Sequence, residues 1–229
     1  MIEDPPLLQL KRNIKRPSSK QVKALAKVST GVLVDCLGGR AALNHTVKPI
    51  SPEASRFAGV AITCDAGPAD NLAVFGAIHL ACEGDVVVIA TGGYMATAVI
   101  GDMVLGLAKN AGVTAMVTDG CVRDIEGICK VGLPCFASGV TPDSPARNGP
   151  GSAGLMVTVA GRQVNSGDVI VGDKDGVVVV PFCQIDLVIN RLESVMAQES
   201  ALESRIAEGL SMPEFAGDVL SSDRVRWVD

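Results

Sequence analysis

The chain has 229 residues, of which 48% are hydrophobic and 20% are charged, and its formal net charge is −5 at pH 7. Apart from a short basic segment at 11–16 it lacks clustered lysine and arginine, which argues against a nucleic-acid partner, because such partners require a basic surface stripe. No apolar run reaches about 18 residues, and residues 1–6 lack the charged-then-apolar order of a signal peptide, so we expect a cytoplasmic protein without a membrane partner.

The N-terminal part of the chain alternates between helical and strand patterns. Ser18-Ser19 can cap a first helix and Gly38-Gly39 can end a second, because serine accepts hydrogen bonds from free N–H groups and glycine adopts the left-handed backbone that closes a helix. Two continuous apolar runs are typical of strands buried on both faces. The predicted elements are helices at 18–27, 30–37 and 70–82, the last capped by Asp70, and strands at 57–64 and 85–90.

A further helix is predicted to begin at Asp102. Four apolar residues between 103 and 108 form a single stripe, which is the spacing of a helix that packs by one face. An acidic residue in the first turn is stabilised by the helix dipole. The free N–H groups of Met103 and Val104, next to Gly101, are then available to an anion such as a substrate carboxylate.

Arg123 and Asp124 follow the next predicted strand, at 113–118, after a short turn. They therefore lie beyond a strand's carboxyl end, the edge where ligands bind in open α/β sheets, and we expect them to face the same crevice as Asp102. The alternative is structural: Asp102 acts as a simple helix cap, and Arg123-Asp124 is a solvated pair before a helix that starts at Ile125. The spacing alone does not decide between the two.

The second half of the chain is rich in short strands and ends in a long helix whose apolar face extends to Met196. Proline, glycine, serine and asparagine at 141–153 predict a loop. The predicted elements are strands at 134–138, 155–160, 169–172 and 177–180 and a helix at 183–207. We expect a mixed α/β single domain over 1–229, with its core at about 20–210 and a less regular tail at 211–229.

Seven cysteines, an odd number, are poor material for a disulfide framework. Cys121, Cys129 and Cys135 flank Arg123-Asp124, but no Cys-x-x-Cys pair or neighbouring histidine accompanies them, which disfavours a zinc site. The other four lie in apolar runs, where free thiols pack as small hydrophobic groups. They are Cys36, Cys64, Cys82 and Cys183.

The stretch 92–124 resembles a known family. It is similar to the class II, divalent-metal pyruvate aldolases that cleave 4-hydroxy-4-methyl-2-oxoglutarate and 4-carboxy-4-hydroxy-2-oxoadipate, within the superfamily that also contains the RraA regulator of ribonuclease E. The resemblance covers roughly residues 20–210. Asp102, followed after twenty residues by Arg123-Asp124, is the pattern of the aldolase branch.

That resemblance implies an RraA-like swivelling β/β/α fold, an α-β-β-α sandwich in one domain with a long C-terminal helix. It also implies homotrimers, often paired into hexamers, with the sites at subunit interfaces. Glu199, on the C-terminal helix, then corresponds to a glutamate that enters the neighbouring subunit's site. The alternative for Glu199 is a solvated surface carboxylate, the default for glutamate on a helix.

The residue types suit a metal-dependent aldolase, and the resemblance implies a role in aromatic-acid catabolism. Mg²⁺ or Mn²⁺ held by Asp124 would be chelated by a 4-hydroxy-2-oxo acid through its keto oxygen and C1 carboxylate. Arg123 would stabilise the pyruvate enolate left by retro-aldol cleavage, and Asp102, together with Glu199, would relay the proton. Because oxaloacetate decarboxylation passes through the same enolate, we expect it as a side activity. Nothing in the sequence selects the C4 substituent of the substrate.

One other mechanism and one other function are the alternatives to a metal-dependent aldolase. A Schiff-base mechanism is disfavoured because Lys109, Lys130 and Lys174 lie at helix ends or turns, where lysine stays solvated and protonated. A non-catalytic regulator that binds ribonuclease E is the alternative that the superfamily allows, because function resides in the site and not in the fold. The complete carboxylate and arginine set, with Glu199, favours the enzyme.

Overall fold

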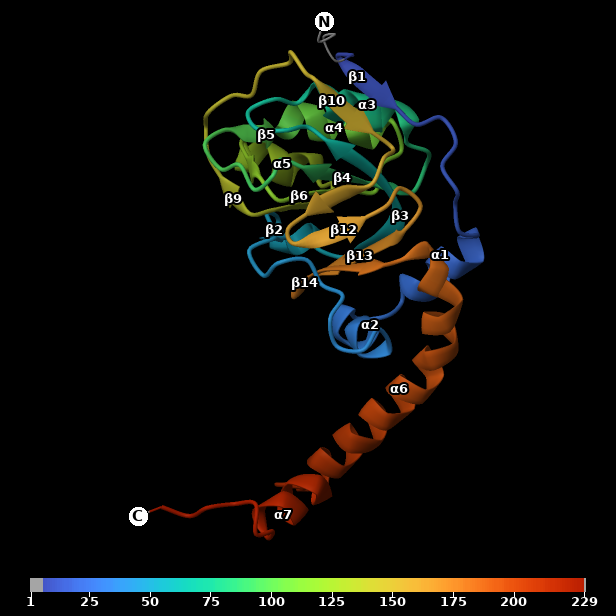
Figure 1. Ribbon diagram of the computed structural model, residues 1–229, viewed down its shortest axis with the longest axis vertical. Coiled ribbons are helices and arrows are strands. Elements are labelled where there is room, and N and C mark those ends of the chain that lie inside the picture. The colour runs from blue at the N-terminus through green and yellow to red at the C-terminus, as the bar shows by residue number, and fades with distance from the viewer. Residues whose placement is uncertain (1–5, 229) are drawn as a thin grey trace, which may run out of the picture.

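The computed structural model describes residues 6–228; residues 1–5 and 229, which include most of the segment that argues against a signal peptide, lie outside the described residues. An α/β body carries the sheets, and a long helical arm leaves it at one end (Figure 1). Among the described residues, no helix combines the length and the apolarity needed to cross a bilayer.

One large sheet organises the body, and its central strands are parallel. β3, β4, β6 and β8 lie side by side in that order, with β2 beyond β8. β13 pairs antiparallel with the first half of β3 and with β14, while β10 pairs with the end of β3 and with β1. The bounds are β1 (Leu8–Leu10), β2 (Lys48–Pro49), β3 (Phe57–Asp65), β4 (Asp85–Ala90), β6 (Ala115–Thr118), β8 (Cys135–Ala137), β10 (Gly151–Ala153), β13 (Val169–Asp173) and β14 (Gly176–Val180).

Two smaller sheets complete the β structure. β5 (Ala98–Ile100), β7 (Cys121–Val122) and β9 (Gly139–Val140) form a parallel sheet, and each follows one of the parallel strands β4, β6 and β8 along the chain. The small sheet therefore extends the carboxyl edge of the large one. β11 (Val157–Val159) and β12 (Arg162–Val164) form an antiparallel hairpin.

Helices α1 to α6 begin where the sequence predicts, within about two residues. Ser18 caps the first helix through a capping box with Gln21, whose N–H lies 3.3 Å from the Ser18 Oγ. The bounds are α1 (Ser19–Leu25), α2 (Thr30–Cys36), α3 (Leu72–Leu80), α4 (Asp102–Asn110), α5 (Ile125–Val131), α6 (Ile185–Ala207) and α7 (Glu214–Leu220).

Three hydrophobic cores stack the elements in four layers, helix, sheet, sheet and helix. One core joins α3, α4 and α5 to one face of the large sheet. The second lies between the other face of the parallel strands β3, β4, β6 and β8 and the strands β11, β12, β13 and β14. The third joins the outer face of β13 and β14 to α1, α2 and the start of α6. Strand periodicity makes this possible, since Val177 and Val179 of β14 enter the second core while Val178 and Val180 enter the third. The predicted α-β-β-α sandwich is confirmed.

Three local predictions were wrong. The segment 141–153 is not only a loop, because its last residues form β10 and pair with β1 and β3, strands remote in sequence. The tail contains α7, which the irregular pattern did not predict. Asp70 is not the cap residue of α3, which is Asn71, although the Asp70 carboxylate accepts a hydrogen bond from the Leu72 N–H at 2.8 Å.

Candidate functional site

Asp102, Arg123 and Asp124 line one cavity of about 660 Å³ at the outer edge of the small parallel sheet. Asp102 begins α4 directly after β5, and Arg123 and Asp124 stand between β7 and α5. These residues thus converge in one crevice, as the sequence predicts. The remaining lining residues are Ile125, Glu126, Gly127, Lys130, Val140, Thr141 and Pro142.

Asp102 sits in the first turn of α4, as predicted, with Gly101 as the cap residue. Its Oδ1 accepts a hydrogen bond from the Met103 N–H at 2.7 Å. The Met103 amide is therefore already engaged, so an incoming carboxylate has to displace this contact to use it, which corrects the expectation of a free amide. The Met103 side chain is 78% exposed, whereas Val104 packs into the first core.

Arg123 and Asp124 form a close pair at the cavity wall. The Arg123 Nε lies 3.2 Å from Asp124 Oδ2, and the two side chains are 36% and 45% exposed. An ion pair this exposed contributes about 0–1 kcal/mol to stability, so fold maintenance is a weak explanation for it. The Arg123 backbone N–H is anchored to the Ile100 carbonyl at 3.1 Å, and its NH1 donates to the Ser144 hydroxyl.

Asp124 also has an uncommon backbone. It adopts φ 62° and ψ 48°, the left-handed region, at the residue that precedes α5. Aspartate tolerates this conformation better than most residues, and such backbones concentrate at functional sites. The turn places the carboxylate beside Arg123 and against the start of α4.

Two glycines make room for the two carboxylates. A Cβ on Gly101 would lie 2.5 Å from Asp124 Oδ2, and a Cβ on Gly127 would overlap the Asp102 carboxylate. Helices α4 and α5 can therefore approach with both carboxylates between them only if these positions lack side chains.

The donor set fits a hydrated hard cation. Asp102, Asp124 and Glu126 all line the cavity, yet within residues 6–228 no three histidine, cysteine or acidic side chains converge as a closed metal cage. Mg²⁺ commonly uses one or two carboxylates and completes its shell with water and substrate oxygens. The half-exposed Asp124 carboxylate matches that mode of binding.

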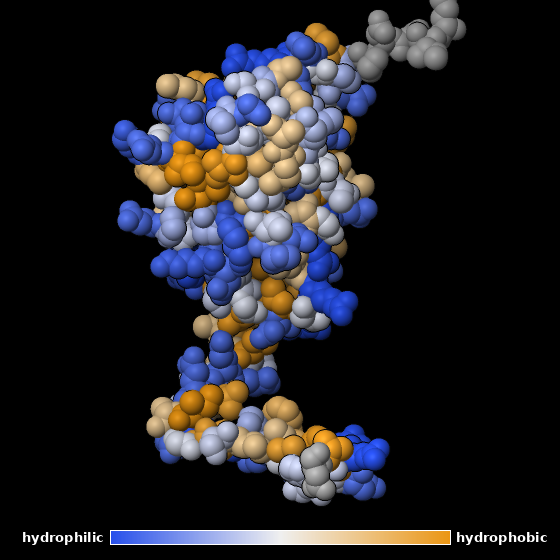
Figure 2. Space-filling view, turned by 90° about the vertical axis from the view of Figure 1, so that its left-hand side faces the viewer, coloured by the Kyte–Doolittle hydropathy of each residue, from blue (hydrophilic) through white to orange (hydrophobic). Residues whose placement is uncertain are grey.

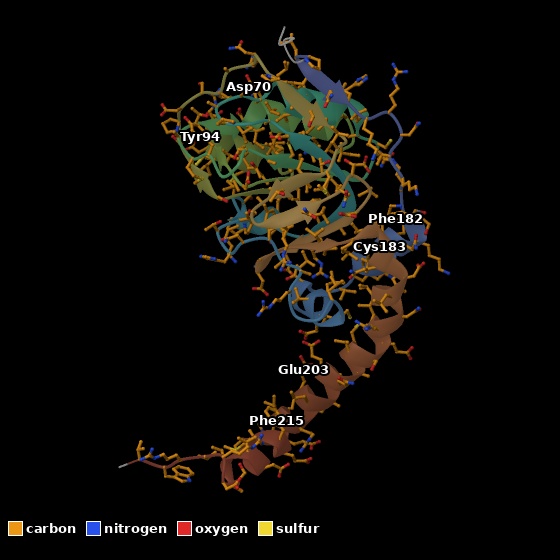
Figure 3. All side chains as sticks on the ribbon, in the orientation of Figure 1. Asp70, Tyr94, Phe182, Cys183, Glu203 and Phe215 are labelled. Atoms are coloured by element: carbon orange, nitrogen blue, oxygen red, sulfur yellow. The ribbon has the colours of Figure 1, made fainter. Side chains whose placement is uncertain are left out.

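Glu199 does not reach this cavity within its own chain. It lies on the exposed part of α6, one turn before Glu203, which Figure 3 shows on the arm well away from the body. Its predicted role in a neighbouring subunit's site stays a prediction.

The cysteines near the cavity are poor metal ligands in this state. Burial raises the pKa of Cys121 and raises the pKa of Cys135 to about 12, so both thiols stay protonated at neutral pH. Cys129 is exposed on α5. Of the four cysteines expected to be packed, Cys36 and Cys64 are buried, but Cys82 and Cys183, each the last residue of its apolar run, are exposed.

Sequence reasoning missed the contribution of Ser144 to this site. It lies in the segment 141–153, whose composition indicates a loop and gives no signal for a contact with Arg123. Glu126 and Lys130 were also not assigned to the cavity, although their place on α5, directly after Asp124, could have indicated it.

The chain matches known proteins over most of its length. A family model described as RraA-like, Aldolase/RraA, matches residues 26–179. A protein of Halalkalibacterium halodurans named "Putative 4-hydroxy-4-methyl-2-oxoglutarate aldolase" is 35% identical over 183 residues, which cover 80% of this chain and 87% of that protein.

Two solved structures share the fold. RraAS2 of Streptomyces coelicolor, described as an unusual member of the RNase ES inhibitor RraA protein family, has a TM-score of 0.73 and 26% identity, covering 83% of this chain and 100% of that one. The RNA-processing inhibitor RraA of Thermus thermophilis has a TM-score of 0.62 and 29% identity, covering 67% and 93%. The resemblance inferred from residues 92–124 is confirmed, and the chain belongs to the RraA-like, Aldolase/RraA family.

Proposed function

We propose that the chain is a divalent-metal-dependent pyruvate aldolase. Its substrates are 4-carboxy-4-hydroxy-2-oxoadipate, cleaved to pyruvate and oxaloacetate, and 4-hydroxy-4-methyl-2-oxoglutarate, cleaved to two pyruvates. The observation that carries the proposal is the single cavity in which Asp102, Arg123 and Asp124 meet. Relatives named as aldolases of 4-hydroxy-4-methyl-2-oxoglutarate support the same reaction class.

Asp124 and Arg123 act on the keto acid half of the substrate. Asp124 would hold Mg²⁺ or Mn²⁺, and the metal would supply Lewis acidity to the keto acid. Arg123 donates hydrogen bonds to the oxygen on which negative charge develops, and its guanidinium remains protonated throughout. The Val104 N–H, together with the Met103 N–H once released by Asp102, binds the C1 carboxylate at the start of α4.

Asp102 acts on the proton of the C4 hydroxyl. Cleavage breaks the C3–C4 bond: Asp102 takes the hydroxyl proton through a water, C4 becomes a carbonyl carbon, and the bonding electron pair moves into the pyruvate enolate. The enolate then takes a proton at C3. Because loss of CO₂ from oxaloacetate gives the same enolate, the chain decarboxylates oxaloacetate as a side reaction.

Glu199 assists this proton transfer from a neighbouring subunit in a trimer or hexamer. The arm supports the assembly, because large apolar side chains along it are exposed, and Figure 2 shows orange apolar atoms on its outer end. Phe215 is 72% exposed and Trp227 80%. Side chains of this size are seldom left in water without a partner surface.

The test is pyruvate release from both substrates by the purified protein. We expect turnover with Mg²⁺ or Mn²⁺, loss of turnover in excess EDTA, and recovery when metal is restored. Arg123→Ala should lower the rate of pyruvate release at least about 100-fold, as expected for the loss of a group that stabilises developing charge. Arg12→Ala, an exposed arginine outside the cavity, is the matched control and should retain full activity.

A non-catalytic regulator of ribonuclease E is the second candidate. Similarity to the RNA-processing inhibitor RraA of Thermus thermophilis, at 29% identity, favours it. Absence of turnover with both substrates under every divalent metal would move the assignment to this function. The measurement would then be inhibition of ribonuclease E by the purified chain.

A further inference from the structure

The guanidinium of Arg123 is held at two of its nitrogens. Nε faces Asp124 Oδ2 at 3.2 Å, and NH1 donates to the Ser144 Oγ. Among residues 6–228, the third nitrogen, NH2, has no hydrogen-bond partner. Because the guanidinium is planar, fixing its Nε and NH1 also fixes the direction in which NH2 can donate. A donor with a fixed direction is what recognition of a carboxylate or an enolate oxygen requires.

Ser144 is itself fixed, because the chain on its N-terminal side is tied to the small parallel sheet. The Thr141 N–H donates to the Val122 carbonyl at 3.0 Å, next to Arg123. The Ala98 N–H donates to the Asp143 carbonyl at 2.9 Å. The residue directly before Ser144 is thus bonded to β5, so the serine hydroxyl is placed relative to the strands that carry the cavity.

Asp70 binds the chain on the C-terminal side of Ser144. Its Oδ2 accepts the N–H groups of Asn148 and Gly149 at 2.6 and 3.1 Å, while its Oδ1 accepts the Leu72 N–H at the start of α3. Asp70 is 9% exposed, so the three bonds are partly buried. The Ala146 N–H and carbonyl add two backbone bonds to the segment 69–71. Figure 3 shows Asp70 on the body, where the loop crosses it.

We propose that Ser144 is a positioning residue that orients the Arg123 guanidinium for substrate, from a loop that Asp70 locks to α3. The inference rests on the proposed function for its catalytic consequence, although the orientation itself does not. Nothing else in the described residues holds NH1, since Ser144 makes the one side-chain hydrogen bond found there. Misplacement of such a group by about 1 Å can cost up to about 100-fold in rate.

The first measurement is kinetic, on Ser144→Ala, Ser144→Thr and the control Ser152→Ala, whose hydroxyl makes no side-chain hydrogen bond within residues 6–228. We expect Ser144→Ala to lower kcat/KM for aldol cleavage about tenfold, chiefly through a higher KM, at an unchanged Tm. Ser144→Thr keeps the hydroxyl and should restore activity to within about twofold of wild type. Equal kinetics for Ser144→Ala and Ser152→Ala in an active enzyme would overturn the role.

The second measurement does not depend on turnover. In protein labelled with ¹³C and ¹⁵N arginine, rotation of the guanidinium about its Cζ–Nε bond is measured by NMR exchange, with Arg123→Lys to assign the signal. Wild type and Ser144→Thr should rotate several-fold more slowly than Ser144→Ala. If the wild type turns over no substrate, the proposed function fails, but slower rotation in the wild type than in Ser144→Ala still supports the orientation of Arg123 by Ser144. Equal rotation in wild type and Ser144→Ala contradicts that orientation, whatever the activity.

Discussion

The cavity between α4 and α5 and the α6–α7 arm differ in how far one chain completes them. The cavity is lined entirely by residues of the body of one chain, and the two glycines beside its carboxylates leave little freedom. The arm packs only through its root, where Ile185, Val188 and Leu192 enter the third core. Beyond them Met196 is 49% exposed and Ile206 57%. One chain thus fully specifies the part of the proposed site that contains Asp102, Arg123 and Asp124, whereas the proposed role of Glu199 requires a neighbouring subunit.

The largest effect should come from the metal side of the cavity. Asp124→Asn removes the charge that holds the cation, so we expect aldolase activity to fall at least about 100-fold and Mn²⁺ binding, followed by paramagnetic resonance of the free ion, to weaken in parallel. Thermal stability should change little, because the Arg123–Asp124 pair is exposed. Full activity in Asp124→Asn at saturating Mn²⁺ would show that the metal is held elsewhere.

The arm is tested by complementation between two inactive chains. In a site shared between subunits, Arg123 comes from one chain and Glu199 from the next. If Glu199→Ala and Arg123→Ala chains are refolded together in equal amounts, about a quarter of the sites contain both native residues, so about a quarter of wild-type activity should return. Mixing Glu199→Ala with Asp102→Ala provides a second shared pair, and Arg123→Ala with Asp102→Ala, which both alter the same half, should recover nothing. Activity no higher than the separate mutants would confine the site to one chain.

Gly127 offers a smaller effect. Gly127→Ala adds a methyl group that overlaps the Asp102 carboxylate and should lower kcat about tenfold. The same overlap opposes the preference of a helix for alanine over glycine, about 0.5–1 kcal/mol, so this variant should gain no stability. Gly106→Ala on α4, where nothing lies within 4 Å of the added Cβ, is the control and should gain stability at full activity. A Gly127→Ala enzyme with normal kcat would mean that the Asp102 position is not critical.

These contrasts also show what a sequence can and cannot predict. Helix starts at Ser18 and Asp102 were predictable because capping and the apolar stripe are local signals. β10 was missed because its partners are remote in sequence, and a three-residue strand made of glycine, serine and alanine has no pattern of its own. The contact between Ser144 and Arg123 was missed because it joins residues that are remote in sequence.

The extent to which α6 packs on its own chain was not predicted. The apolar face extends to Met196, yet the packed stripe stops at Leu192 and Val195, where the body ends. Periodicity identifies the face of a helix that packs, but not whether the partner surface belongs to the same chain.

The root of the arm gives the smallest and most local test. Asp173 at the end of β13 accepts hydrogen bonds from the backbone N–H and the hydroxyl of Thr30, both at 2.8 Å, and so ties α2 to the layer that α6 packs on. Burial raises the pKa of Asp173, but the bonds from Thr30, together with the Asp175 N–H and Arg56, outweigh it and leave the pKa below its ordinary value.

A carboxyl whose folded pKa is depressed stabilises the fold at pH values above its unfolded pKa, near 4, and this contribution is lost as the pH falls through the folded pKa. Because Asp173 is only partly buried, Asp173→Asn should cost about 1 kcal/mol or less at pH 7, which corresponds to about 2–4 °C in Tm. The difference in Tm from wild type should shrink as the pH falls below about 4, while aldolase activity at 25 °C stays unchanged. Asp175→Asn, on the exposed turn beside it, is the matched control, and a Tm difference for Asp173→Asn that persists undiminished to pH 3 would show that the carboxylate charge does not secure the root of the arm.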